Sequence, residues 1–211
     1  MRKVLVASSK GGCGKTTVAT NLAAYWSQRK RNTVAIDADP QASTLHWCAK
    51  RPDGLPGVLG MVGRRHCLNR LPPDAQRVVI DTAAGSSVDN LGYWLDEADA
   101  VVVPILPSVI DLEASLPWLE ALAMHPRVKR GKLPVALIAN RLKPWTRASQ
   151  GATGEMRSYP FPLIAELRDS QAYVLLAGLG KGLFDYQSEQ VRSHQQDWAK
   201  LLRWLRRTGE N

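Results

Sequence analysis

The stretch S-S-K-G-G-C-G-K-T-T, residues 8–17, decides the fold of this chain. A short apolar run at residues 4–7 precedes it, and its uncharged, partly β-branched composition predicts a buried strand. A helical spacing of apolar residues follows from Thr17 onward. A strand, a glycine-rich turn and a helix in this order are the setting that a phosphate-binding loop requires.

The residue types in this loop suit a polyphosphate. Glycines let the backbone curl so that several N–H groups point at one anion, and the next helix adds its positive N-terminal end. Lys15 can reach the outer phosphates, and the hydroxyl of Thr16 can bind Mg²⁺. Ser9 stands where the strict G-x-x-x-x-G-K-[ST] pattern has its first glycine, and a second lysine, Lys10, stands at the entrance. A glycine-rich turn with lysines nearby by chance is the competing interpretation.

The sequence K-G-G-x-G-K-T-T resembles the deviant Walker A motif of the ParA/MinD family of ATPases. The resemblance implies ATP and Mg²⁺ as cofactors, with Lys15 as a catalytic residue and Lys10 reaching across a dimer interface to the partner's ATP. The implied nucleotide contacts are Gly11, Gly12, Cys13, Gly14, Lys15, Thr16 and Thr17. The wider class also serves septum placement, nitrogenase electron transfer and iron–sulfur assembly, so the family does not fix the cargo.

Two further apolar runs end in aspartates. Residues 33–37 are followed by D-P-Q, and residues 77–81 end at Asp81. Carboxylates at the carboxyl ends of parallel strands lie where ligands bind, and near a triphosphate they need a cation or a water between them. By resemblance, Asp39 is the switch residue that positions the attacking water, Asp37 holds the Mg²⁺ shell, and Asp81 stands near Mg²⁺ with Thr16. Solvated aspartates in strand-end turns are the alternative.

The remaining pattern predicts a doubly wound, mostly parallel sheet flanked by helices. The resemblance implies that this is a P-loop NTPase fold of the SIMIBI, deviant Walker A type. Strands are expected at residues 100–104, 133–140 and 161–167. Helices are expected at residues 42–50, 58–71 and 86–97, and from the N-cap Ser108 to about residue 125. By resemblance, Asn140 recognises adenine and Pro162 approaches it. A turn asparagine is the alternative for Asn140.

Residues 187–207 are expected to form one long helix. Apolar residues recur at spacings of three and four, and the other side carries the candidate DNA-binding residues Arg192, Lys200, Arg203, Arg206 and Arg207. Three interpretations stay open: a closing helix with a solvated basic face, a face that binds DNA non-specifically, and a basic amphipathic membrane helix.

Composition predicts one domain over residues 1–211, with ordinary apolar and charged fractions of 45% and 22%. The net charge of +9 favours a polyanionic partner, either nucleic acid or an anionic membrane. No run approaches the roughly 18 apolar residues of a membrane span, no signal-peptide pattern opens the chain, and three cysteines without C-x-x-C spacing suggest reduced thiols in cytoplasm.

We therefore expect a ParA-like, slowly hydrolysing ATPase that forms a homodimer with ATP and binds nucleoid DNA non-specifically. It would segregate or position a plasmid, a chromosome region or a protein complex. A ParB-like or other small adaptor protein would stimulate it. A MinD-like membrane-associated ATPase is one alternative, disfavoured because the basic pattern begins well inside the last helix. A metabolic ATPase of the same fold is the other.

Overall fold

A computed structural model describes residues 1–208 of the chain, apart from the side chain of Gln190. A seven-stranded sheet forms its centre, in the order β3-β2-β4-β1-β5-β6-β7, and every pairing is parallel. The strands are β1 (Arg2–Val6), β2 (Thr33–Ala38), β3 (Leu59–Val62), β4 (Arg77–Thr82), β5 (Ala100–Ile105), β6 (Val135–Leu142) and β7 (Leu163–Arg168). The predicted doubly wound architecture is confirmed, and the expected strands are all present.

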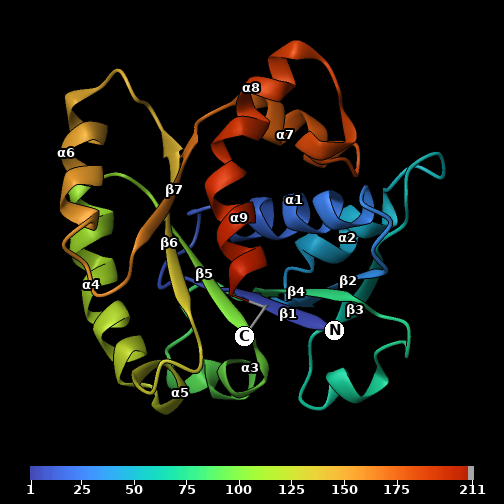
Figure 1. The fold of residues 1–211 in the computed structure, drawn as a ribbon, viewed down its shortest axis with the longest axis horizontal. Helices are drawn as coiled ribbons and strands as arrows, with labels where there is room; N and C mark the ends of the chain where they lie inside the picture. The colour runs from blue at the N-terminus through green and yellow to red at the C-terminus, as the bar shows by residue number, and fades with distance from the viewer. Residues whose placement is uncertain (209–211) are drawn as a thin grey trace.

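Helices cover both faces of the sheet (Figure 1). One face carries α1 (Lys15–Ser27), α2 (Ser43–Ala49), α7 (Gln171–Gly178), α8 (Glu189–Asp197) and α9 (Ala199–Arg207). The other carries α3 (Gly92–Glu97), α4 (Val109–Met124), α5 (Pro126–Lys129) and α6 (Arg147–Met156). The side chain of Ser108 accepts a hydrogen bond from the N–H of Asp111, which confirms the predicted cap of α4.

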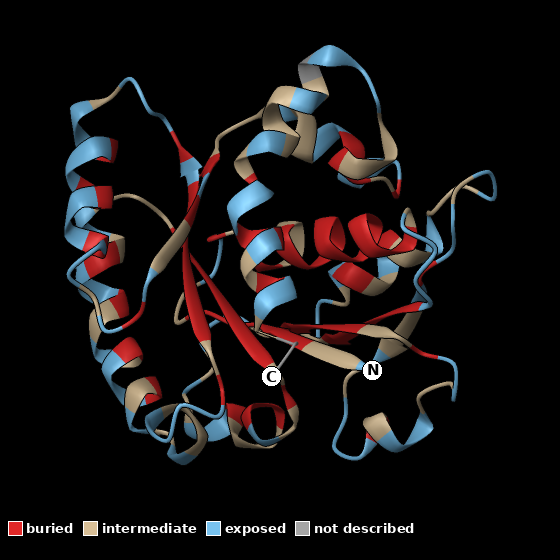
Figure 2. Cartoon of the chain, in the orientation of Figure 1, coloured by how far each residue is buried: buried red, intermediate tan, exposed pale blue. Residues whose placement is uncertain are grey.

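The core consists of two apolar layers, one on each side of the sheet. Along β1, Val4 and Val6 pack toward α1, whereas Leu5 packs toward α4. Figure 2 shows the central strands and α1 as buried. A parallel sheet covered on both faces needs strands that are apolar throughout, which is why the sequence shows continuous apolar runs rather than alternation.

The helix expected at residues 58–71 is wrong. The structure has the edge strand β3 and then a short 3₁₀ helix, Cys67–Arg70. Parallel pairing with β2 satisfies the backbone of β3, in a register that places Val34 beside Leu59 and Asp37 beside Val62. Similarly, the helix expected at residues 86–97 is reduced to a 3₁₀ turn, Asp89–Leu91, followed by α3.

The single long helix expected at residues 187–207 is also wrong, because α8 and α9 meet at Trp198. The N–H of Trp198 donates to the carbonyl of Gln195 at 3.1 Å, which tightens the turn there. The Trp198 side chain is fully buried, and its indole N–H donates to the Tyr173 hydroxyl at 3.0 Å. Leu201, together with Leu202 and Leu205, faces the core as predicted. Among the described residues, no helix has the length and apolarity needed to cross a membrane.

Candidate nucleotide-binding site

The loop between β1 and α1 lies at the carboxyl end of the sheet, where its backbone turns in the left-handed region. Gly12 has a φ of +74° and Gly14 a φ of +92°. A Cβ on Gly14 would stand 2.1 Å from Nδ2 of Asn140, so this position needs glycine both for its conformation and for space. The curled backbone can therefore present its N–H groups to one anion.

Asn140, near the carboxyl end of β6, contacts this loop through its side-chain amide. Its side chain is only 4% exposed, and its Nδ2 donates to the carbonyl of Cys13 at 2.7 Å. The amide is thus occupied by the loop backbone. The structure brings Asn140 to the loop, as the sequence predicts, and its role toward adenine stays a prediction.

The two lysines of the loop have different surroundings. Lys15 is 7% exposed, and its Nζ donates to the carbonyl of Lys10 at 3.0 Å, inside the curl of the loop. Lys10 points away from that curl: its Nζ lies 3.1 Å from Oδ1 of Asp111 and donates to the carbonyl of Ile110 at 3.3 Å. The Nζ of Lys15 therefore lies within the loop, whereas Lys10 is held at the start of α4, and their roles toward phosphates stay predictions.

Asp81 at the end of β4 lies directly beside the loop. Its Oδ2 accepts hydrogen bonds from the hydroxyls of Thr16 at 2.7 Å and Thr44 at 2.8 Å. Its Oδ1 is buried and has no hydrogen-bond partner among the described residues. Burial raises the pKa of Asp81 to about 6, although the two threonine hydroxyls act in the opposite direction. A buried carboxylate oxygen without a partner, beside a threonine hydroxyl, fits a hard cation such as Mg²⁺.

Asp37 organises the segment that follows β2. Its Oδ1 accepts from the N–H of Asp39 at 3.0 Å, and its Oδ2 accepts from the N–H groups of Thr44 at 2.7 Å and Leu45 at 3.0 Å. Both oxygens therefore fix residues 39–45 against the sheet. Asp39 itself is half-buried, and its Oδ1 accepts from the N–H of Gln41 at 2.9 Å. The predicted roles of Asp37 in the Mg²⁺ shell and of Asp39 in orienting water remain predictions.

Sequence reasoning missed two residues of this site. Thr44 is fully buried and joins the two acidic strand ends, since its hydroxyl contacts Asp81 and its N–H contacts Asp37. Asp111 is the ion-pair partner of Lys10. The only sequence signals were their places at the start of α2 and in the P-S-x-x-D segment.

Pro162 does not lie at this site. It is exposed and precedes β7, and its carbonyl accepts from the N–H of Leu137 at 2.9 Å. That contact lies near the amino ends of β6 and β7. Asn140 lies toward their carboxyl ends, where the N–H of Asp169 donates to the carbonyl of Leu142. The sequence predicts Pro162 within the strand at residues 161–167, whereas the structure places it just before β7.

The predicted DNA-binding residues lie apart from the loop, on α8 and α9. All are exposed: Arg192, Lys200, Arg203, Arg206 and Arg207.

Comparison with known proteins identifies the fold and the family. The family profile described as the CobQ/CobB/MinD/ParA nucleotide binding domain matches residues 4–181. "Maintenance of carboxysome distribution protein A" of Halothiobacillus neapolitanus is 35% identical over 153 residues, which cover 69% of this chain and 70% of that protein.

Two solved structures share the fold. An ATP complex of McdA from Cyanothece superposes with a TM-score of 0.71 at 17% identity and covers 95% of this chain and 96% of that chain. The MinD cell division protein of Aquifex aeolicus has a TM-score of 0.74 at 16% identity and covers 100% of this chain and 98% of that chain. Matched along most of its length by one family profile, the chain belongs to the CobQ/CobB/MinD/ParA nucleotide-binding domain family.

Proposed function

We propose that this chain is an ATP-dependent positioning ATPase of the ParA type. It binds ATP with Mg²⁺ at residues 10–17, dimerises in that state, and holds DNA non-specifically while a cargo is distributed. The observation that carries the proposal is the cluster of Thr16, Asp81 and Thr44 beside a loop with two lysines, one directed into the loop and one away from it.

The residues of the loop have distinct tasks in this mechanism. Lys15 exchanges its contact with the Lys10 carbonyl for the outer phosphates, and the loop N–H groups hold the phosphate oxygens. Thr16 and Asp81 would hold Mg²⁺, which would neutralise part of the phosphate charge. Asp39 orients the attacking water, and Asp37 keeps Asp39 in place through the N–H contact.

Lys10 acts as the switch between monomer and dimer. Its partly exposed ion pair with Asp111 contributes about 1 kcal/mol or less, so the phosphates of a partner's nucleotide compete with it easily. In the dimer, Lys10 leaves Asp111 and contacts the partner subunit's ATP. ATP binding and dimerisation are thereby coupled through one side chain.

The cargo class is supported by the relatives. The 35% identical protein is named for carboxysome distribution, which favours a protein assembly over a plasmid or a chromosome region. A ParB-like protein or another small adaptor would stimulate hydrolysis and release the dimer. The expected location is the cytoplasm, on the nucleoid.

Three variants test this mechanism. Lys132→Ala is the control, because Lys132 is exposed and precedes the amino end of β6, whereas the loop lies at the carboxyl ends of the strands. Titration calorimetry with ATP and Mg²⁺ should show no binding for Lys15→Ala. Light scattering should show that Lys10→Ala binds ATP but stays monomeric. Asp39→Ala should dimerise, hydrolyse poorly and accumulate on DNA.

An ATP-dependent dimer of Lys10→Ala would refute the cross-subunit role. If the ATP-bound wild type sediments with anionic liposomes and not with DNA, the DNA step is refuted and a membrane-associated ATPase takes its place.

A further inference from the structure

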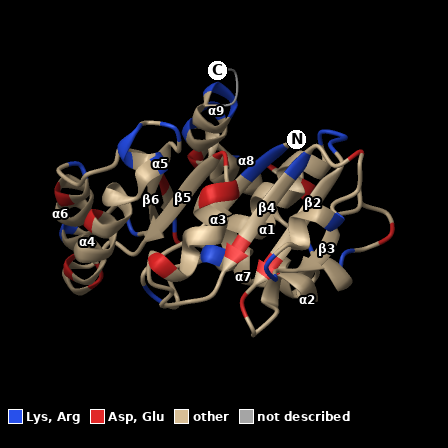
Figure 3. Ribbon diagram, turned by 90° about the horizontal axis from the view of Figure 1, so that it is seen from below, with Lys and Arg blue, Asp and Glu red and all other residues tan. Residues whose placement is uncertain are grey.

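A groove of about 940 Å³ lies at the amino-terminal edge of the sheet, opposite the nucleotide loop. The end of α1, the first residues of β1 and β4, and helix α9 form its walls. Figure 3 shows basic positions around the N-terminus and along the end of α9. Six arginines line the groove: Arg2, Arg29, Arg31, Arg77, Arg203 and Arg206.

The described lining of this groove is rich in positive charge. Its lining contains no aspartate or glutamate within the part of the chain that the structure describes. Among the same residues, the arginines other than Arg2 take part in no ion pair. Burial, and then the nearby charge of Arg31, lower the pKa of Arg77. Like charges are therefore gathered in one concavity, which a bound polyanion would stabilise.

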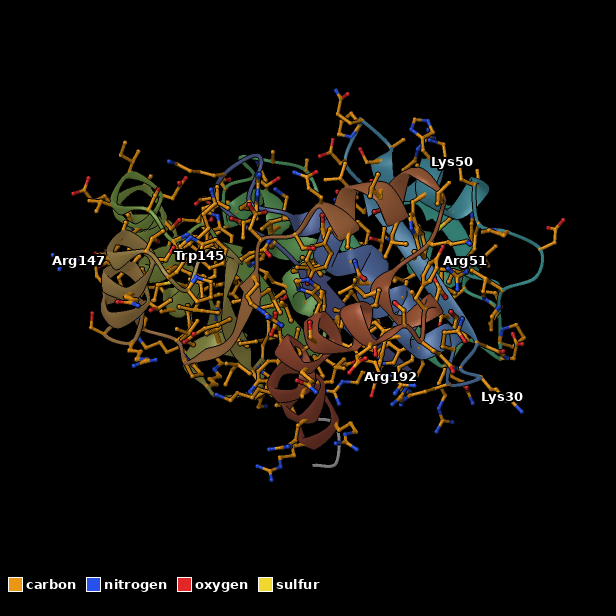
Figure 4. The ribbon with its side chains drawn as sticks, turned by 90° about the horizontal axis from the view of Figure 1, so that it is seen from above. Lys30, Lys50, Arg51, Trp145, Arg147 and Arg192 are labelled. Atoms are coloured by element: carbon orange, nitrogen blue, oxygen red, sulfur yellow. The ribbon has the colours of Figure 1, made fainter. Side chains whose placement is uncertain are left out.

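Some arginines of the groove lie on, or just after, helices whose apolar side chains are mostly buried. Arg29 lies over the ring of Tyr25, with its guanidinium carbon 4.1 Å from the ring centroid. Tyr25 and Trp26 belong to the buried part of α1 and are 8% and 6% exposed. Opposite them, Arg203 and Arg206 extend from α9, whose leucines are buried. In the view of Figure 4, Lys30, which lies between Arg29 and Arg31 in the sequence, projects from the rim of the molecule.

We propose that this arginine groove binds the phosphate backbone of duplex DNA. The proposal rests on the DNA step of the proposed function and relocates its contacts. Of the five basic residues predicted from the sequence, only Arg203 and Arg206 line the groove. The remaining arginines lie after the end of α1 and at the starts of β1 and β4, so the pattern of the C-terminal segment does not indicate them.

The shape of the site favours duplex DNA over the other polyanions. A membrane surface needs several apolar side chains that can insert, but the rings of Tyr25 and Trp26 are buried. Met1 is the one large apolar side chain that is exposed among the described lining residues. Single strands bind through exposed aromatic rings on which bases stack. In the groove, the ring of Phe184 packs against Tyr25, and that of Tyr186 is covered by Lys181. Contacts between the arginine side chains and the phosphate backbone of duplex DNA are the remaining way for this groove to bind a polyanion.

The experiment compares two double variants that each remove two exposed cations. Arg29→Ala/Arg31→Ala alters the groove, and Arg192→Ala/Lys200→Ala alters predicted residues outside its lining. Binding is measured by fluorescence anisotropy with ATP and Mg²⁺ over a series of salt concentrations. The probes are a labelled 30-base-pair duplex and one of its strands alone, and anionic liposomes serve as the competitor. Thermal melting of both variants verifies folding.

We expect the groove variant to bind duplex about tenfold more weakly, with the slope of log Kd against log salt smaller by about 1.8 for two lost phosphate contacts. The Arg192→Ala/Lys200→Ala variant, called the outer pair below, should bind duplex with a Kd within about twofold of wild type. Arg29→Lys/Arg31→Lys should recover most of the binding, because the charge is kept.

Three results would overturn the proposal that the groove binds duplex DNA. Equal or greater loss in the outer pair places the DNA contact elsewhere and leaves the proposed function standing. Groove-dependent binding of liposomes or of single strands in preference to duplex refutes the assignment to duplex DNA. Absence of DNA binding by the ATP-bound wild type refutes the DNA step itself, and the groove proposal with it.

Discussion

At the scale of single residues, the site is held by contacts between side chains that are far apart in the sequence. Lys10 with Asp111 and Thr44 with Asp81 are two such pairs. The loop glycines and both loop lysines were predictable, because one continuous motif carries them. Thr44 and Asp111 were not, since their importance depends on which strand ends the sheet brings together. Pro162 was expected inside the strand at residues 161–167, but β7 begins only at Leu163, so Pro162 precedes the strand at its amino end.

Asn140 gives a prediction at this scale. Its amide is bonded to the Cys13 carbonyl, so Asn140→Ala leaves that carbonyl without its donor and loosens the loop. We expect ATP and GTP affinity to fall alike, by a factor of about ten for a cost of about 1.4 kcal/mol. Calorimetry with both nucleotides measures this, and Asn69→Ala, far from the loop in a short 3₁₀ helix, serves as control. A loss confined to ATP would instead assign Asn140 to adenine recognition.

At the scale of elements, the central strands were predictable and the edge strand was not. Residues 33–38, 77–82 and 100–105 are apolar runs buried on both faces, whereas β3 is half-exposed and contains Gly60. Its basic continuation produced a helix-like pattern by coincidence. The break at Trp198 was hidden because the apolar spacing continues through it, and the backbone hydrogen bond from Trp198 to Gln195 marks it only in the structure.

A buried ion pair joins two elements and yields a pH prediction. Arg51, after α2, and Asp185, before α8, lie 2.8 Å apart with side chains 3% and 0% exposed, and Figure 4 shows Arg51 amid the helices. Burial alone would raise the pKa of Asp185, but hydrogen bonds from Arg51, the Gly182 N–H and Gln28 hold it below 3.8. Because the folded pKa is depressed, this contribution is complete above pH 3.8 and is lost as pH falls below it.

Asp185→Asn should therefore lower the free energy of unfolding at pH 7 by about 3–5 kcal/mol, since it leaves the Arg51 charge buried and unpaired. Urea denaturation at pH 7 and at several lower pH values measures the effect. The variant should also lose less stability than wild type as the pH falls below 3.8. The exposed Asp53→Asn is the control. Equal acid sensitivity of Asp185→Asn and wild type would contradict the assignment.

At the scale of the whole molecule, α1 connects the two proposed binding sites. It begins at Lys15 in the nucleotide loop, is buried for most of its length, and ends just before Arg29 and Arg31 in the groove. Its thirteen residues span about 20 Å. The net charge of +9 favours a polyanionic partner, but composition cannot reveal where the charge gathers, because the arginines of the groove come from four separate segments.

This connection predicts reciprocal coupling between the ligands. If ATP with Mg²⁺ strengthens binding of the 30-base-pair duplex, the duplex must strengthen ATP binding by the same factor, for which about 5–150-fold is typical. Anisotropy and calorimetry measure the two factors on one protein sample. The Asp39→Ala variant, which we expect to hydrolyse ATP poorly, keeps the measurement close to equilibrium. Arg29→Ala/Arg31→Ala should reduce both factors together, and a change in only one would contradict the linkage.

The contact between β1 and α9 has a practical consequence for work in living cells. The guanidinium of Arg2 bonds to the Arg206 carbonyl and the Thr208 hydroxyl, and Met1 lines the same groove. A fluorescent reporter fused ahead of Met1 would emerge between the arginines and hinder the DNA binding that we propose for the groove. Insertion at the exposed turn around Gly54 avoids this obstruction. Imaging with the two labels side by side would separate a mislocalised protein from an obstructed one.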